Sequence, residues 1–301
     1  MQKMTPASKF QRMFAAIMDI MLAFLFATLL SSFVVSPIIA NSNAYKDNYL
    51  IYENGLIATK LYQKDENNSN KLTCIIDLTN PDGSIIFNIE KLEEYDEKLI
   101  EFYSNYSVDA VERYQNTKAE SNIYIKNESN QYVLTESINI NDAYNFFATS
   151  YIDATKYYFE QNEIVNNAYY YLSISSTYAL IIPAIISLLI CYIVLPIVFK
   201  DGQTIAKKLF SLKVVSLKSN KTLNKGQVVL REMFFVIVEL VLSYFTYCIP
   251  LIVSVVFMLL NKNHLSFHDY IGQTYVIDCL NIDKKEERHD ANIIDVDVKE
   301  I

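Results

Sequence analysis

The stretch RMFAAIMD, residues 12–19, opens the first long apolar run of this 301-residue chain. Residues 13–40 are apolar apart from Asp19 and a few hydroxyl groups, which is long enough to cross a bilayer of about 30 Å as a helix. A carboxylate inside such a span costs roughly 2.5–3.5 kcal/mol on insertion scales and is seldom idle. Arg12 and Asp19 are seven positions apart and share one face of a helix. The pattern predicts a membrane protein with a buried polar element.

Composition supports this class. Hydrophobic residues make up 51% of the chain and charged residues 20%, a mixture that fits apolar spans joined to polar domains. The first apolar run exceeds the 7–15 residues of a signal-peptide core, so we expect an uncleaved span. The four cysteines have no metal-ligand spacing, and no cofactor is expected. The absence of Trp and the abundance of Asn, Ile and Lys are typical of a bacterial protein from an AT-rich genome.

The distribution of charge predicts the topology. Residues 1–12 carry a net charge of +3, residues 41–170 carry −11 and residues 200–228 carry +6. Basic flanks stay in the cytoplasm, so we expect a multi-pass protein of the cell membrane with a cytoplasmic N-terminus and an extracytoplasmic segment at 41–170. The second crossing is expected at about residues 174–199, with a cluster of tyrosines before it as an aromatic belt.

The third apolar stretch, residues 228–260, is long for one helix and short for two full spans. Pro250 interrupts it, and basic residues flank both ends, which favours a helical hairpin that returns to the cytoplasm. A single tilted span with an outside C-terminus is the alternative. Residues 212–217 and 274–278 alternate as strands do, and they pair only if both lie on the same side of the membrane. The hairpin is therefore the expected arrangement.

The predicted fold class is an α-helical polytopic membrane protein with a small cytoplasmic β-element and an inserted mainly-α or α+β extracytoplasmic domain. Its expected segments follow the chain in order: the cytoplasmic N-terminus with the first transmembrane helix (1–40), the inserted domain (41–170), the second transmembrane helix (171–200), a basic cytoplasmic link (201–227), the third apolar region (228–260), and a cytoplasmic segment with a charged, solvated tail (261–301).

Within the insert, the apolar spacing over residues 85–117 predicts an amphipathic helix, and residues 139–167 form another helical stretch. Residues 49–63 and 72–89 contain shorter β-like runs. The insert has no His, no Gly-rich loop and no nucleophile beside an evident base, so we expect neither an enzyme nor a nucleic-acid-binding protein.

Three separated blocks resemble the RDD family of membrane proteins, which is named for one Arg and two Asp. Residues Arg12-Met-Phe-Ala-Ala-Ile-Met-Asp19 match its first block, and Gly202-Gln-Thr-Ile-Ala-Lys-Lys-Leu-Phe-Ser-Leu-Lys-Val-Val215 is similar to its GqTlGKrllglrVv pattern. Leu230-Arg-Glu232 resembles LlRe, and His268-Asp-Tyr-Ile-Gly-Gln-Thr-Tyr-Val-Ile277 resembles hDllaGTvVv, which makes Asp269 the second Asp. The resemblance covers roughly residues 10–40 and 175–278.

The chain departs from the family pattern at three places. Ala206 replaces a Gly before the paired Lys, and Gln273 is inserted between Gly272 and Thr274. About 130 residues are inserted between the first two spans, where many family members have a short loop. The resemblance implies nothing about that domain, but it links some relatives to cation–proton antiport.

The candidate ion, proton or structural polar site consists of Arg12, Asp19, Glu239 and Asp269. Arg12 fits a snorkelling anchor as well as a site residue. Asp19 fits either an interhelical hydrogen bond or a proton- or cation-binding carboxylate. Glu239 is a second intramembrane acid, which either shares a proton or cation with Asp19 or is unrelated to it. Asp269 follows Ser266 in a Ser-x-x-Asp pattern typical of a helix start.

A second set of residues is basic. Lys207, Lys208 and Arg231 are candidate contacts for anionic lipid headgroups, at around 1 kcal/mol each near a membrane surface. Together with the lipid bilayer itself, the expected partners are protons or monovalent cations and either further copies of the chain or other membrane proteins.

Two classes of function follow. One is a transport-related protein with a proton or monovalent-cation site around Asp19, which would need to oligomerise because its membrane segments are few. The other is a non-transport anchor or assembly protein, whose buried polar residues fix helix packing and display the outer domain. Flux that is lost in Asp19→Asn while folding is kept would indicate the first class, and lost assembly or expression would indicate the second.

Overall fold

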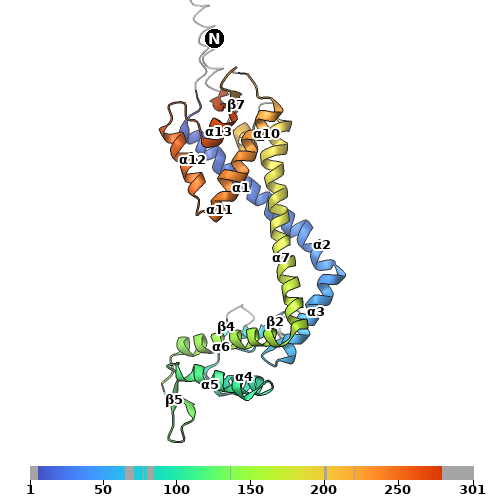
Figure 1. Ribbon diagram of the computed structural model, residues 1–301, viewed down its shortest axis with the longest axis vertical. Coiled ribbons are helices and arrows are strands. Elements are labelled where there is room, and N and C mark those ends of the chain that lie inside the picture. Colours follow the sequence, from blue (N-terminus) through green and yellow to red (C-terminus); the bar gives the residue numbers. More distant parts are fainter. Residues whose placement is uncertain are drawn as a thin grey trace, which may run out of the picture. The chain divides into compact units, whose positions relative to one another are not determined.

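The computed structural model describes residues 6–64, 71–76, 78–79, 85–135, 137–199, 202–219 and 221–279. The tail predicted to be solvated lies outside these ranges. The chain divides into two compact units. Unit 1 consists of Met1–Pro37 and Thr177–Ile301, and unit 2 of Ile38–Ser176. Figure 1 labels their elements.

The first apolar helix begins earlier than predicted. Helix α1 (Lys9–Leu30) starts at a capping box, in which the Ser8 hydroxyl accepts from Gln11 N at 3.2 Å and the Gln11 side chain accepts from Ser8 N at 3.2 Å. A π-helical segment, η1 (Ser31–Val35), and α2 (Ser36–Asn41) continue it. Together they form an apolar helix of 33 residues, Lys9–Asn41, which is long enough to cross a bilayer.

The second long apolar helix is Glu163–Val198, built from α7 (Glu163–Leu189), the π-helical η3 (Ile190–Val194) and α8 (Leu195–Val198). Hydroxyl groups join it to the first helix within unit 1. Ser31 Oγ donates to the carbonyl oxygen of Ala179 at 2.7 Å, and Ser187 Oγ donates to that of Ala23. Such bonds between small residues let helix backbones approach closely in lipid.

The third apolar stretch turns back on itself. It runs through α10 (Lys225–Phe234), the π-helical η4 (Phe235–Val241) and α11 (Leu242–Phe245), and it returns as α12 (Ile249–Leu260). Tyr247 and Cys248 make the turn with positive φ angles of 52° and 65°. Ser243 Oγ accepts from Leu251 N at 3.1 Å and fastens the two arms. The 12 residues of α12 span only about 18 Å, which is less than the thickness of the hydrocarbon layer.

Strands β7 (Leu212–Ser216) and β8 (Thr274–Asp278) pair antiparallel, with Val214 opposite Val276. Ala7 N donates to Val276 O at 2.9 Å, so the segment before α1 joins the edge of this sheet. Two short helices, α9 (Ile205–Leu209) and α13 (Phe267–Gly272), lead into the two strands. A small core of buried residues fills the space between α1, α9 and the sheet: Ala7, Ala15, Ala206, Leu212, Val214 and Val276.

Unit 2 combines helices with three two-stranded antiparallel pairs among the residues described. Its elements in chain order are α3 (Asn43–Ala58), β1 (Tyr62–Lys64), β2 (Leu72–Cys74), β3 (Leu78–Thr79), β4 (Ile85–Ile86), the 3₁₀ turn η2 (Ile89–Lys91), α4 (Leu92–Ser104), α5 (Val108–Ala119), β5 (Tyr124–Lys126), β6 (Tyr132–Leu134) and α6 (Ile140–Gln161). The strands pair as β1–β2, β3–β4 and β5–β6.

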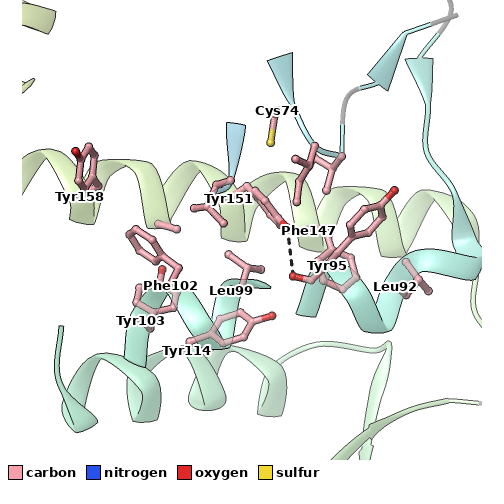
Figure 2. Packing of buried hydrophobic residues seen from close by; sticks show 14 of the residues in the cluster. Cys74, Leu92, Tyr95, Leu99, Phe102, Tyr103, Tyr114, Phe147, Tyr151 and Tyr158 are labelled. Carbon is pink, nitrogen blue, oxygen red and sulfur yellow. Dashed lines mark hydrogen bonds between the residues drawn. The ribbon is translucent and has the colours of Figure 1, made fainter. Parts of the chain in front are cut away.

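Aromatic rings dominate the core of unit 2 (Figure 2). Phe147 on α6 is fully buried and lies 5.8 Å from the Tyr95 ring of α4, edge to face. Tyr103 of α4 stacks on Tyr114 of α5 at 5.5 Å. Edge-to-face and stacked pairs of this kind add about 0.5–1.5 kcal/mol beyond the area they bury.

Three predictions for unit 2 differ from the structure. The single helix expected over residues 85–117 is broken between α4 and α5, because Ser107 caps a new helix by accepting from Ala110 N at 3.1 Å. Residues 49–63 were expected to contain β-like runs, but residues 49–58 belong to α3, and strand β1 begins at Tyr62. The helical stretch expected at 139–167 is divided at Asn162, which has extended dihedrals of −127° and 90°.

Candidate functional site

Asp269 is the centre of the polar site in unit 1. It lies in the first turn of α13, as the Ser-x-x-Asp pattern predicts. Ser266 N donates to Asp269 Oδ2 at 3.3 Å, and Ser266 Oγ donates to the same oxygen at 2.6 Å. The carboxylate therefore belongs to the cap of its own helix.

Two guanidinium groups meet on Asp269. Arg12 of α1 donates to Oδ2, and Arg231 Nε of α10 donates to Oδ1 at 2.9 Å. Arg12 also donates to the carbonyl oxygen of His264, so the predicted surface anchor is a buried cross-link between α1 and the segment before α13. Burial opposes the charged form of Asp269, but Arg12 and Arg231 outweigh it and hold the pKa of this carboxyl well below its usual range.

Asp19 has different partners from Arg12. Its Oδ1 accepts from Ala206 N at 2.9 Å, and its Oδ2 accepts from the Thr204 hydroxyl. Thr204 is the N-cap of α9, so this carboxylate on α1 anchors the start of a helix 185 residues further along the chain. No hydrogen bond or ion pair between Arg12 and Asp19 occurs among the described contacts.

Glu232 is a site residue that the sequence analysis did not single out, although it stands in the Leu230-Arg-Glu232 block. It is 2% exposed, forms an ion pair with Arg231, and lies 3.4 Å from Lys207 Nζ. Burial and the charge of Arg231 lower the pKa of Lys207, and Glu232 acts in the opposite direction. No sequence pattern marks Glu232, because it meets its partner Lys207 only in the folded chain.

These contacts correct the prediction of lipid-headgroup binding. Arg231 is 1% exposed and is held by two carboxylates, so it is not available to a headgroup. Lys207 is occupied by Glu232. Lys208 is exposed, and its Nζ lies over the Phe199 ring, 4.4 Å from the ring centroid. Of the three basic residues, it alone remains a candidate for binding a lipid headgroup.

Glu239 binds His268. This glutamate lies in the π-helical segment η4, where its Oε1 accepts from His268 N at 2.9 Å and lies 3.0 Å from His268 Nδ1. His268 Nε2 lies 2.9 Å from Ser266 Oγ. Glu239 and Asp19 thus have separate hydrogen-bond partners, although both line the same cavity.

A cavity of about 280 Å³ lies among these groups. Its walls carry Asp19, Glu232, Glu239 and His268, together with Tyr192 of η3. The Tyr192 hydroxyl is buried and has no hydrogen-bond partner among the residues that the structure describes. Two of the three π-helical segments in the described part of unit 1, η3 and η4, line this space, as π-helical turns often do at functional sites.

The buried charges of the site are nearly balanced. Three cationic side chains face four carboxylates. They are Arg12, Lys207 and Arg231 on one side, and Asp19, Glu232, Glu239 and Asp269 on the other. With a neutral His268 the cluster carries a net charge of −1. Charges with few water contacts are retained only when they are paired and hydrogen-bonded, which explains the density of contacts here.

Part of the chain matches a known protein family. The model of the RDD family matches residues 143–273, a range that includes Arg231, Glu239 and Asp269 and ends before β8. Arg12 and Asp19 lie outside the matched range, although they bind residues inside it. No curated protein and no solved structure matches the chain. The match over residues 143–273 confirms the resemblance of the chain to the RDD family.

Proposed function

We propose that this integral membrane protein exchanges protons for monovalent cations through the cavity of unit 1. One observation carries the proposal: the cavity is lined by carboxylates, basic groups and a histidine within a unit that contains the greater part of both long apolar helices. Ionisable residues at membrane depth are costly, and they commonly mark ion pathways and proton relays.

The proposed topology follows from contacts among distant segments. The Ala7–Val276 hydrogen bond and the pairing of β7 with β8 bring together the N-terminus, the basic link and the segment after the hairpin. Three segments that meet in one sheet lie on one side of a membrane. The charge of +3 on residues 1–12 favours the cytoplasm as that side, and the proposed topology then has residues 41–170 outside.

The hairpin enters the bilayer without crossing it in this arrangement, because α12 is about 18 Å long. Two full spans are few for a transport pathway. We therefore expect the functional unit to contain several copies of the chain, which light scattering of the detergent-solubilised protein measures directly.

The test is cation-dependent proton flux in proteoliposomes, with Na⁺, K⁺ and Li⁺ supplied in turn. Asp19→Asn is compared with wild type at matched amounts of folded protein, and Asp153→Asn, at an exposed position of unit 2, is the matched control. Flux that is present in wild type and the control but lost in Asp19→Asn supports the proposal. Absence of flux in wild type with all three cations contradicts it and leaves the anchor or assembly function.

A further inference from the structure

The hydrogen bonds around His268 specify where its protons are. Ser266 Oγ has one hydrogen, which it donates to Asp269 Oδ2 at 2.6 Å. Asp269 is ionised, since two guanidinium groups hold its pKa low, and an ionised carboxylate only accepts. Ser266 Oγ is therefore the acceptor in its 2.9 Å contact with His268 Nε2. This ring nitrogen carries a hydrogen.

The second ring nitrogen faces Glu239 Oε1 at 3.0 Å. If Glu239 is ionised, Nδ1 must also carry a hydrogen, and His268 is then a cationic imidazolium. If Nδ1 is bare, Glu239 must be the protonated partner. In both cases the pair holds one proton more than a neutral histidine beside an ionised glutamate, and the proton belongs to the pair.

Charge balance gives the same answer independently. The buried cluster has a net charge of −1 without the additional proton, and it is neutral with it. Glu239 is 1% exposed and the His268 side chain 14%, so an uncompensated charge would be costly there. The imidazole is surrounded by groups from three elements: Glu239 and Phe235 of η4, Asp269 and Ser266 at the start of α13, and Glu232 of α10.

We propose that the His268–Glu239 pair is the proton-carrying element of the site and releases its proton when a monovalent cation enters the cavity. This inference rests on the proposed function and moves the proton from Asp19 to a different pair. The step balances: one proton leaves the pair for water, one monovalent cation takes its place, and the cluster stays neutral. The cavity reaches from Asp19 to His268, which gives the cation room beside the carboxylates.

The first experiment observes the proton without requiring transport. The chain has three histidines, so ¹⁵N-histidine NMR of the full-length protein in detergent gives few signals, and His268→Gln assigns the one of interest. We expect an imidazolium signal for His268 at neutral pH, or a neutral imidazole beside a protonated Glu239 seen by carboxyl ¹³C shifts. A singly protonated His268 beside an ionised Glu239 would overturn the inference.

The second experiment measures proton release in weakly buffered detergent solution on addition of Na⁺, K⁺ or Li⁺ chloride, with choline chloride as the ionic-strength control. Wild type should release about one proton per protein. Glu239→Gln and His268→Gln should each release less than about a tenth of that amount, whereas Glu101→Gln, a matched change at an exposed ion pair of unit 2, should release as much as wild type. Release that persists in both pair variants, or no release from wild type, would overturn the inference.

The two proposals fail separately. Cation-induced proton release that depends on the pair, without flux in proteoliposomes, upholds the inference and contradicts transport. Flux that is lost in Asp19→Asn but unchanged in Glu239→Gln and His268→Gln supports transport and contradicts the inference about the pair.

Discussion

Unit 1 and unit 2 bury different chemistry. The polar site of unit 1 brings together seven charged side chains through ion pairs and hydrogen bonds, whereas the core of unit 2 is rich in tyrosine and phenylalanine rings. Apolar burial stabilises a domain surrounded by water, but lipid tails are as apolar as leucine, so it does not hold helices together in a bilayer. We therefore expect polar contacts to determine how the helices of unit 1 pack. We expect aromatic ring contacts to determine how those of unit 2 pack.

The largest expected effect comes from Asp269→Asn, which leaves Arg12 and Arg231 buried with a weaker, neutral partner. Breaking a buried pair in this way costs about 3–5 kcal/mol, so we expect unit 1 to lose most of its folded population. The yield of folded protein after detergent extraction measures this loss, and Glu101→Gln, at an exposed ion pair, is the control. Normal yield and stability of the Asp269 variant would show that unit 1 does not depend on its buried ion pairs.

Phe147→Ala should destabilise unit 2 by about 3 kcal/mol, because it empties a fully buried site among aromatic rings. Unit 1 should be unaffected, since its cluster shares no side chain with this core. Limited proteolysis followed by mass spectrometry distinguishes the units: new cleavage sites should be confined to residues 38–176. Cleavage that spreads equally into unit 1 would show that the two units unfold together.

Lys118→Met sharpens the comparison, because it removes a charge from the aromatic core. The Lys118 ammonium lies 2.6 Å from Asp96 and over the rings of Tyr114 and Tyr124, and it is almost fully buried. Methionine fills a similar volume, and Asp96 retains 17% exposure to water. We expect a loss of only about 1–2 kcal/mol in thermal unfolding of unit 2, well below that for Asp269→Asn. An equal loss would mean that unit 2 also depends on its buried ion pair.

The units should also respond to opposite extremes of pH. The pKa of Asp269 is held low in the folded state, so its contribution is present above about pH 4 and is lost as pH falls further and the carboxylate binds its proton. Burial, with a smaller effect of Asp153, raises the pKa of Tyr103 to about 12. The unfolded chain loses this phenol proton near pH 10, so stability of unit 2 decreases above that pH. Proteolysis across a pH series should show unit 1 opening in acid and unit 2 in alkali, and the reverse order would contradict both assignments.

The smallest effect is expected for Ser31→Ala, which removes the hydroxyl bond to Ala179. Hydrogen bonds between membrane helices average about 0.6 kcal/mol, because the separated helices find other partners. Steric trapping or thermal unfolding in detergent should detect a change of this size, and Ser176→Ala, whose hydroxyl bonds within its own helix, is the control. A loss of unfolding free energy above about 2 kcal/mol would show that the hydroxyl bonds stabilise unit 1 about as much as its ion pairs do.

Much of this organisation could be predicted from the sequence. Asp19 stood out because it interrupts an apolar run, and the Ser266–Asp269 cap follows from residue spacing. The partners of Arg12 and Asp19 could not be predicted, because they lie 257 and 185 residues away and no local pattern joins them. The π-helical segments also lack a signal in residue type. In unit 2 the break at Ser107 was missed because the apolar period continues across it into α5.

The separation of Arg12 from Asp269 has a consequence for biosynthesis. At about 5–20 residues per second, the ribosome needs roughly 10–50 s to reach the partner of Arg12 after making it, and the insert occupies about half of that interval. During this time α1 is a nascent helix with an unpaired arginine and an unpaired aspartate. We expect it to be retained by the insertion machinery or a chaperone until α9 and α13 emerge, so shortening the insert should shorten that retention.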